Sequence, residues 1–167
     1  MSRFRKIGSV GSSLLVPFAV VVIQGILAYR FRVFNYFDLP LIYCVYYGFT
    51  RSKPVASAFL GGGLGLLQDS LSRHAMGTNG FSKALLCFAA ASTSLKFNVD
   101  QAITRIFALF LFTVADRLLV SILGLAMGTG QGEIFSGGLM DLILSGVFNT
   151  LLGLIMFGFR DRFRHAP

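Results

Sequence analysis

The stretch "GLLQDSLSRHAMGTNGFSKALL", Gly65 to Leu86, decides the class of fold. An apolar run ends in Gln68 and Asp69, a polar loop follows, and a second apolar run begins at Phe81. In a soluble domain this pattern is an ordinary helix end and turn. In a membrane it needs a specific reason, because an ionisable side chain inside a span is costly. The composition of the whole chain decides between the two environments.

Charged residues are scarce throughout the chain. Of its 167 residues, 54% are hydrophobic and 13% are charged, whereas about 25% of residues are charged in a typical soluble domain. A soluble fold of this size could not cover its surface with so few charges. The apolar runs do not alternate with polar residues as the strands of a membrane barrel do. The sequence therefore predicts an all-α integral membrane protein, with one transmembrane domain over residues 1–167.

Six apolar segments predict six transmembrane helices, at residues 12–29, 34–49, 54–71, 81–95, 103–127 and 134–159. The second segment is the weakest. Its apolar part, Leu39 to Phe49, rises only about 16 Å as a helix, against about 30 Å of hydrocarbon core. Asp38 can cap this helix and Pro40 can occupy its first turn. The helix must either extend back into "FRVFNYF", residues 31–37, or enter the membrane only part-way.

The basic residues predict the orientation. The net charge of +8 comes from 15 Lys and Arg against 7 Asp and Glu, and the basic residues form short clusters between apolar runs. This arrangement is typical of cytoplasmic loops rather than of a nucleic-acid surface. With a cytoplasmic N-terminus, ten basic residues lie inside: Arg3, Arg5, Lys6, Arg51, Lys53, Lys96, Arg105, Arg160, Arg162 and Arg164. Four lie outside, namely Arg30, Arg32, Arg73 and Lys83, and Arg117 lies within a helix. Both termini are therefore expected to be cytoplasmic.

Several polar residues fall inside the predicted spans. Asp69 lies near the outer end of the third, Asp116 and Arg117 near the middle of the fifth, and Asp141 in the outer half of the sixth, with Asn149 two turns further in. Adjacent residues of a helix point about 100° apart, so Asp116 and Arg117 do not face each other. Arg117 and Asp141 differ by about 6 Å in depth, which leads to the hypothesis of an Arg117–Asp141 pair. Such charges either fix helix packing or mark a proton or substrate path.

Glycines predict close helix packing. The pairs Gly61 and Gly65, and Gly124 and Gly128, have the small-xxx-small spacing that lets two helices approach, and packing within the chain is the expected use. The run "GTGQG" that begins at Gly128 resembles a phosphate-binding loop only superficially, since no Lys-Ser/Thr follows and no strand precedes it. We interpret it as a turn.

No enzyme or cofactor signature is present in the sequence. His74 and His165 are too few and too far apart to form a metal site. Cys44 and Cys87 lie in apolar runs without CxxC spacing, and are interpreted as small core residues. No acid–base constellation is recognisable, so a membrane enzyme acting on a lipid-linked substrate is disfavoured, and neither a cofactor nor a nucleic-acid partner is expected.

The run "FDLPLIYCVYYGFTRSKPVASAFLGGGLGLLQDSLSRHAMGTNGFSKALL", Phe37 to Leu86, resembles the MreD family of bacterial rod shape-determining proteins. That family has an acidic-Leu-Pro start to its second helix, a basic turn and a glycine-rich third helix that ends in Gly-Leu-Leu-x-Asp. A loop with Gly-x-Asn then opens the fourth helix. These features fall on Asp38, Leu39, Pro40, Arg51, Gly61, Gly65, Asp69, Gly77 and Asn79. The loop "SRHAMGT" departs from the small, proline-bearing loop that is usual in the family.

The resemblance implies a non-enzymatic scaffold of the bacterial inner membrane, with a fold like that of the S components of energy-coupling-factor transporters. Its implied partners are an MreC-like bitopic protein and the lipid bilayer and, indirectly, the MreB filament and the SEDS glycosyltransferase with its penicillin-binding transpeptidase. Asp69 is expected to accept hydrogen bonds from the turn at Thr78 to Gly80 and so to cap the fourth helix. Structural or partner-binding roles are expected for Asp38, Pro40, Gly61, Gly65, Asp69, Gly77, Asn79, Asp116, Arg117 and Asp141.

One alternative function remains open at this point. The likeness to S components suggests a substrate-binding membrane subunit of a vitamin-type transporter. That function needs a polar pocket open to the outside, and Asp69, Asn79 and Asp141 are the residues expected to line it.

Overall fold

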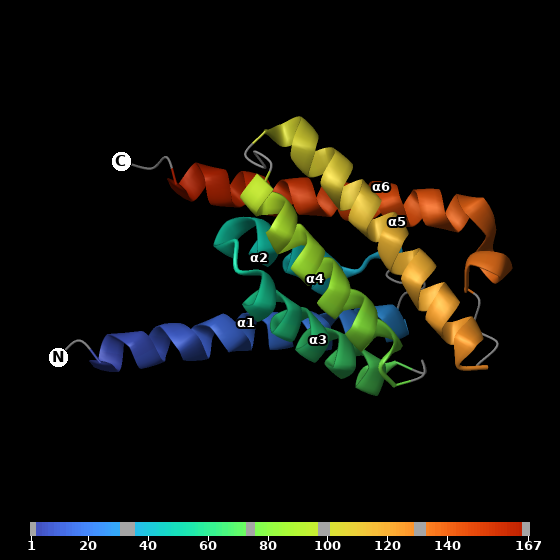
Figure 1. Ribbon diagram of the computed structural model, residues 1–167, viewed down its shortest axis with the longest axis horizontal. Coiled ribbons are helices and arrows are strands. Elements are labelled where there is room, and N and C mark those ends of the chain that lie inside the picture. The colour runs from blue at the N-terminus through green and yellow to red at the C-terminus, as the bar shows by residue number, and fades with distance from the viewer. Residues whose placement is uncertain (1–2, 31–35, 73–75, 97–100, 129–132, 165–167) are drawn as a thin grey trace.

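The computed structural model describes residues 3–30, 36–72, 76–96, 101–128 and 133–164. They form six helices in the order α1 (Arg3–Arg30), α2 (Leu39–Arg51), α3 (Pro54–Leu71), α4 (Thr78–Lys96), α5 (Ala102–Ala126) and α6 (Glu133–Arg164), shown in Figure 1. No strand occurs in these ranges. The all-α prediction is therefore confirmed for the described residues.

The other five helices are arranged around the short helix α2, which contacts each of them. In Figure 1, α6 runs along the top of the bundle and α1 along the bottom, with α2 and most of α4 between them, while α3 crosses α1 and α5 crosses α6 in this view. The first turn of α1 and the last turn of α6 lie at the same end of the bundle. The start of α2 is therefore surrounded by protein.

Helix α2 begins later than the sequence predicted. Its 13 residues run from Leu39 to Arg51, a rise of about 20 Å, and Phe37 and Asp38 precede the helix. Because residues 37 and 38 are not helical, α2 does not extend back to residue 34 as one continuous helix, contrary to the prediction. A helix that enters the membrane only part-way stays a prediction. The physical reason for the later start is the cap: the Asp38 Oδ1 atom accepts a hydrogen bond from the Leu41 N–H at 3.0 Å, and Pro40 occupies the first turn, where its missing N–H costs nothing.

Helices α3 and α4 pack more extensively on each other than any other pair, and two glycines allow the approach. A Cβ atom at Gly61 would lie 2.3 Å from the Lys83 carbonyl oxygen and 2.8 Å from the Cys87 Cβ atom. A Cβ atom at Gly65 would lie 2.2 Å from the Asn79 carbonyl oxygen. The backbones therefore touch where only hydrogen can fit, as in other small-xxx-small contacts. The predicted use of this pair within the chain is confirmed.

The second glycine pair has a different role from the predicted one. Helix α5 ends at Ala126, and Gly128 follows it with a φ of +68°, in the left-handed region that glycine enters without strain. Nothing lies within 4 Å of the position that a Gly128 Cβ atom would occupy. Gly128 therefore belongs to the turn after α5 and does not continue a helix-packing surface from Gly124.

Apolar and polar side chains are distributed as expected for a protein in lipid. The exposed fraction is 79% for Phe59, 73% for Phe107 and 70% for Met140, whereas it is 0% for Lys83 and Asn149. A water-facing surface would favour the reverse distribution. The polar groups of this protein are therefore gathered inside the bundle, and its apolar groups face outward.

Two segments among the described residues are long and apolar enough to cross a membrane, Ile103–Ala126 in α5 and Met140–Gly158 in α6. The segment Pro17–Arg30 of α1 is apolar but shorter. Helix α2 is short, and α3 contains four glycines and ends in polar residues. Six complete spans therefore remain a prediction.

Candidate functional site

Asp69 on the last turn of α3 holds the turn that leads into α4. Its Oδ2 atom accepts hydrogen bonds from the Gly77 N–H at 2.8 Å and the Gly80 N–H at 3.1 Å. Its Oδ1 atom accepts from the Asn79 N–H at 3.2 Å, the Asn79 Nδ2 at 2.8 Å and the Thr78 hydroxyl at 3.4 Å. The hydrogen bonds predicted between Asp69 and this turn are therefore present. They explain why an acidic side chain that is only 2% exposed ends an apolar helix.

Gly77 gives this turn its shape. Its φ of +100° lies in a region that residues with a side chain rarely adopt. The conformation directs the backbone N–H of Gly77 at the Asp69 carboxylate. A glycine is needed here for its conformation rather than for space, since nothing lies within 4 Å of a Cβ atom built at Gly77.

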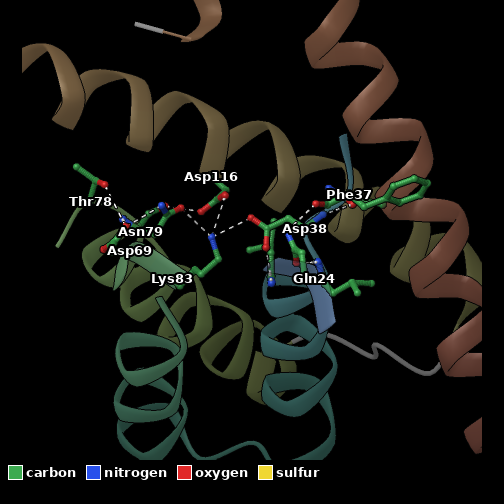
Figure 2. A network of polar contacts seen from close by, with 12 residues as sticks. Gln24, Phe37, Asp38, Asp69, Thr78, Asn79, Lys83 and Asp116 are labelled. Carbon is green, nitrogen blue, oxygen red and sulfur yellow. Dashed lines mark hydrogen bonds and ion pairs between the residues drawn. The ribbon is translucent and has the colours of Figure 1, made fainter. Parts of the chain in front are cut away.

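Lys83 on α4 lies at the centre of the polar contacts in Figure 2 and has no solvent exposure. Its ammonium group lies 2.9 Å from the Asp38 Oδ2 atom and 3.5 Å from the Asp116 Oδ2 atom. It also donates a hydrogen bond to the Asn79 Oδ1 atom at 3.1 Å. We call Asp38, Lys83 and Asp116 the ion cluster. It joins α4, the start of α2 and the middle of α5.

Asp116 is also held by a neutral donor. The Ser82 hydroxyl donates to the Asp116 Oδ1 atom at 2.6 Å, so the two carboxylate oxygens contact adjacent residues of α4. Because both carboxylates of the ion cluster are hydrogen-bonded as well as paired, the cluster meets the condition under which buried charges are tolerated.

Two amide side chains hold the backbone around Asp38. On one side, the Gln24 Nε2 atom of α1 donates to the Phe37 carbonyl at 2.9 Å, and the Leu39 N–H donates to the Gln24 Oε1 atom at 2.8 Å. On the other side, the Asp38 N–H donates to the Asn149 Oδ1 atom of α6 at 2.9 Å. The non-helical residues before α2 therefore have their backbone groups satisfied by side chains, as buried irregular backbone requires.

These contacts form one continuous network across the bundle. It runs from Asp69 on α3 through Asn79 and Lys83 on α4, and from Lys83 to Asp38 and Asp116. Gln24 and Asn149 add α1 and α6 at its Asp38 end. The network therefore connects all six helices through side chains.

Lys83 is the central residue that the sequence interpretation misplaced. The sequence interpretation counts it with the outer cations although it lies two residues inside the predicted fourth helix; in the structure α4 begins at Thr78 and Lys83 lies inside the bundle. The spacing of four between Asn79 and Lys83 places both on one face of a helix. That spacing was the available signal. Gln24 and Ser82 were not singled out either, and no local pattern indicates them.

Arg117 and Asp141 are placed as follows. Arg117 is half-buried on α5, next to Asp116. Asp141, half-buried on α6, accepts a hydrogen bond from the Tyr36 hydroxyl at 3.3 Å. The pairing of Arg117 with Asp141 stays a prediction.

The residues proposed for a transporter pocket do not come together. Asp69 and Asn79 bind each other between α3 and α4, while Asp141 lies on α6. Among the described residues, α6 contacts α5 and α2 but neither α3 nor α4. No group of three His, Cys, Asp or Glu side chains suited to a metal ion occurs in the described part of the chain. The arrangement as a whole therefore holds helices together.

A helical bundle with apolar outer faces and a buried ionic network is typical of helical membrane proteins. The family described as rod shape-determining protein MreD matches residues 5–163. The chain therefore belongs to the MreD family, as the motifs in its second to fourth helices indicated, and has a role in determining rod shape. No curated protein and no solved structure matches it. MreD proteins form a family of shape-determining proteins rather than of enzymes.

Proposed function

We propose that this protein is a non-enzymatic adaptor with six membrane spans in the cell-wall elongation complex. The observation that carries the proposal is the family match over residues 5–163. In this function the protein binds an MreC-like bitopic protein and, through it, the MreB filament and the SEDS glycosyltransferase with its transpeptidase. It thereby helps to organise peptidoglycan synthesis along the cell.

The proposed orientation has both termini in the cytoplasm. It is supported by the common end at which α1 begins and α6 ends (Figure 1). Because Lys83 and Arg105 are both buried in the bundle, each leaves its set, and three outer cations, Arg30, Arg32 and Arg73, remain against nine on the inner side. The ratio of inner to outer positive charge is therefore larger than the sequence alone suggested.

The geometry suits binding through helix faces. Internal polar groups are largely paired with one another, and the outer faces carry large apolar side chains, including Phe59, Phe81 and Phe107. A bundle held from inside in this way presents fixed outer surfaces to the single helix of a bitopic partner. We also propose that the fold resembles that of the S components of energy-coupling-factor transporters.

The test is a pull-down of the tagged protein from its native host in a gentle detergent, read by mass spectrometry. An unrelated tagged polytopic membrane protein, extracted in the same way, is the control. Specific recovery of an MreC-like protein together with cell-wall synthases is the expected result. Recovery of ATPases and a transporter coupling subunit would contradict the adaptor function and support the transporter alternative. Recovery of neither group would also contradict it.

A further inference from the structure

The six helices fall into two groups by their contacts. Helices α1 to α4 form one group, which we call the body, and α5 with α6 forms the second, which we call the hairpin. Among the described residues, neither α1 nor α3 contacts the hairpin. In these ranges the hairpin meets the body through α2, through α4 and through residues 36–38 before α2, where the Tyr36 hydroxyl donates to Asp141 at 3.3 Å.

The interface between body and hairpin is apolar toward the end of the bundle where α2 ends and α5 begins, which we call the inner half. Phe49 of α2 packs against Phe112 of α5, with ring centroids 6.3 Å apart, and against Phe157 of α6 at 6.2 Å. The buried apolar residues of this half are Leu41, Val45, Phe49, Leu86, Ala90, Leu109, Phe112 and Phe157. Separating the hairpin here would lose the close van der Waals packing that holds helices together in lipid.

Beyond this cluster, in the outer half, the interface is mainly polar, with one ring contact between Phe37 before α2 and Phe148 of α6, whose centroids lie 5.1 Å apart. Asp116 of the hairpin contacts Lys83 at 3.5 Å and Ser82 at 2.6 Å in the body. Asn149 of the hairpin accepts the Asp38 N–H at 2.9 Å. Water can replace the polar contacts if the outer half opens, which is not true of packed apolar groups. The two halves of the interface therefore differ in how readily they separate.

The distances within the ion cluster show which contact is the looser one. Lys83 lies 2.9 Å from Asp38 and 3.1 Å from Asn79, both in the body, but 3.5 Å from Asp116 across the interface. If Asp116 moves away, the ammonium group keeps two oxygen partners. The closed arrangement also leaves a donor unused, because the Nδ2 atom of fully buried Asn149 has no hydrogen-bond partner in the described part of the chain. Opening would hydrate that atom.

We propose that the hairpin pivots on the body about the inner apolar cluster, and that the contact of Lys83 with Asp116 holds the outer half closed. The pivot gives the protein two conformations that differ in exposure of the ion cluster to the outer side. It depends only on this chain and is independent of the adaptor function proposed above.

Distances between spin labels test the pivot on the full chain in detergent or nanodiscs. Cysteines at Leu71 of α3 and Met140 of α6 report on the outer half, and cysteines at Val55 of α3 and Ile103 of α5 report on the inner half. All four side chains are more than half exposed, at 58%, 70%, 66% and 69%. The unmodified chain serves as a labelling blank, because its two cysteines are fully buried.

Asp116→Asn is the decisive variant, because it removes the charge across the interface while keeping the size of the side chain and an acceptor for Ser82. The expected result is a second, longer distance for the outer pair and an unchanged distance for the inner pair. Asp38→Asn is the first control, since it weakens an ion pair inside the body and should leave both distances unchanged. Thr113→Val is the second, because the buried Thr113 hydroxyl bonds only to the Leu109 carbonyl of its own helix among the described contacts.

Three results would overturn the proposal. The first is an outer distance in folded Asp116→Asn that matches the parent protein, and the second is equal broadening of both pairs, which indicates general loosening. The third is an Asp38→Asn variant that opens the outer half as far as Asp116→Asn does. If Asp116→Asn does not fold, Asn149→Leu takes its place, because it removes another contact across the interface and is expected to lengthen only the outer distance.

Discussion

Lys83 and Asp38 form an ion pair of 2.9 Å in which the lysine has no solvent exposure. The pair joins α4 to the N-terminal cap of α2, so one carboxylate both starts a helix and neutralises a buried cation. Because α2 begins inside the bundle, its first turn has no access to the polar surface of a membrane. The pair therefore supplies the polar environment that this turn would otherwise lack.

Lys83→Met is expected to be strongly destabilising. It keeps the length of the side chain but leaves two buried carboxylates without their cation, and breaking a buried pair from one side costs about 3–5 kcal/mol. The measurement is the temperature at which the detergent-solubilised protein is lost from its gel-filtration peak. Lys96→Met, at the exposed end of the same helix, is the control, and its effect is expected to stay within about 0.5 kcal/mol.

The same measurement separates unpaired charge from lost packing. A triple variant that adds Asp38→Asn and Asp116→Asn to Lys83→Met removes the unpaired carboxylates and is expected to melt above the single variant. A single variant that melts as high as Lys96→Met would show that Lys83 carries no charge-pairing role in the bundle.

Asp69→Ala is expected to loosen the turn between α3 and α4. The substitution leaves the N–H groups of Gly77, Asn79 and Gly80 without their acceptor. Hydrogen bonds to a charged group contribute about 1.5–3 kcal/mol each, although losses within one cluster do not add. We expect a loss of about 3 kcal/mol in stability, measured by the same melting assay. Ser70→Ala is the neighbouring control, because the exposed Ser70 hydroxyl bonds only to the Leu66 carbonyl among the described contacts.

The role of Asp69 in partner binding is tested on the same variants. Recovery of the MreC-like protein, divided by the amount of bait, is expected to fall for Asp69→Ala and to stay unchanged for Ser70→Ala. If Asp69→Ala leaves both the protein level and the partner recovery unchanged, Asp69 has no organising role at this end of the bundle.

The features that were predicted correctly depend on residues close in sequence. Asp38 and Pro40, which start α2, are two positions apart. Asp69 is eight to eleven positions from the residues whose N–H groups donate hydrogen bonds to it. The pair Gly61 and Gly65 lies one helical turn apart. Caps, tight turns and small-residue spacings involve residues this close in the chain, so they can be recognised in the sequence.

The centre of the network could not be predicted in the same way. Asp38 and Asn149 are 111 positions apart in the chain, and Ser82 and Asp116 are 34 apart. Such partners are set by the tertiary arrangement, which a single sequence does not reveal. Lys83 was missed for a more local reason, because a cation near the start of the predicted fourth helix was counted with the outer charges, whereas α4 begins three residues earlier and Lys83 is buried.

Gly65→Ala is expected to separate α3 from α4. Its added methyl group would lie 2.2 Å from the Asn79 carbonyl oxygen, which is backbone and cannot turn aside. Overpacking of this kind costs about 1–3 kcal/mol. Gly63→Ala is the matched control two residues away, because nothing lies within 4 Å of its added methyl group. That variant is expected to be neutral or more stable, by up to about 1 kcal/mol. Equal melting temperatures for the two variants would contradict the close contact of the two backbones.

An exchange of charges tests the predicted pair of Arg117 and Asp141. Arg117→Asp alone places a second carboxylate beside Asp116 and a like charge opposite Asp141, and Asp141→Arg alone places two arginines at similar depth. Each single variant should therefore melt below the parent protein. The double variant restores opposite charges, and residues in contact couple by about 0.5–3 kcal/mol. It should melt above the less stable single variant by an amount in that range.

The control for this exchange is Tyr36→Phe, which removes the phenol donor to Asp141 without changing any charge. If Asp141 is held mainly by Tyr36, this variant lowers stability as far as Asp141→Arg does, and the double charge variant recovers nothing. If Asp141 pairs with Arg117, Tyr36→Phe costs about 1 kcal/mol or less, as a single hydrogen bond does. The double variant then melts above both single charge variants. A double variant that is no more stable than either single one would show that these two charges serve different neighbours.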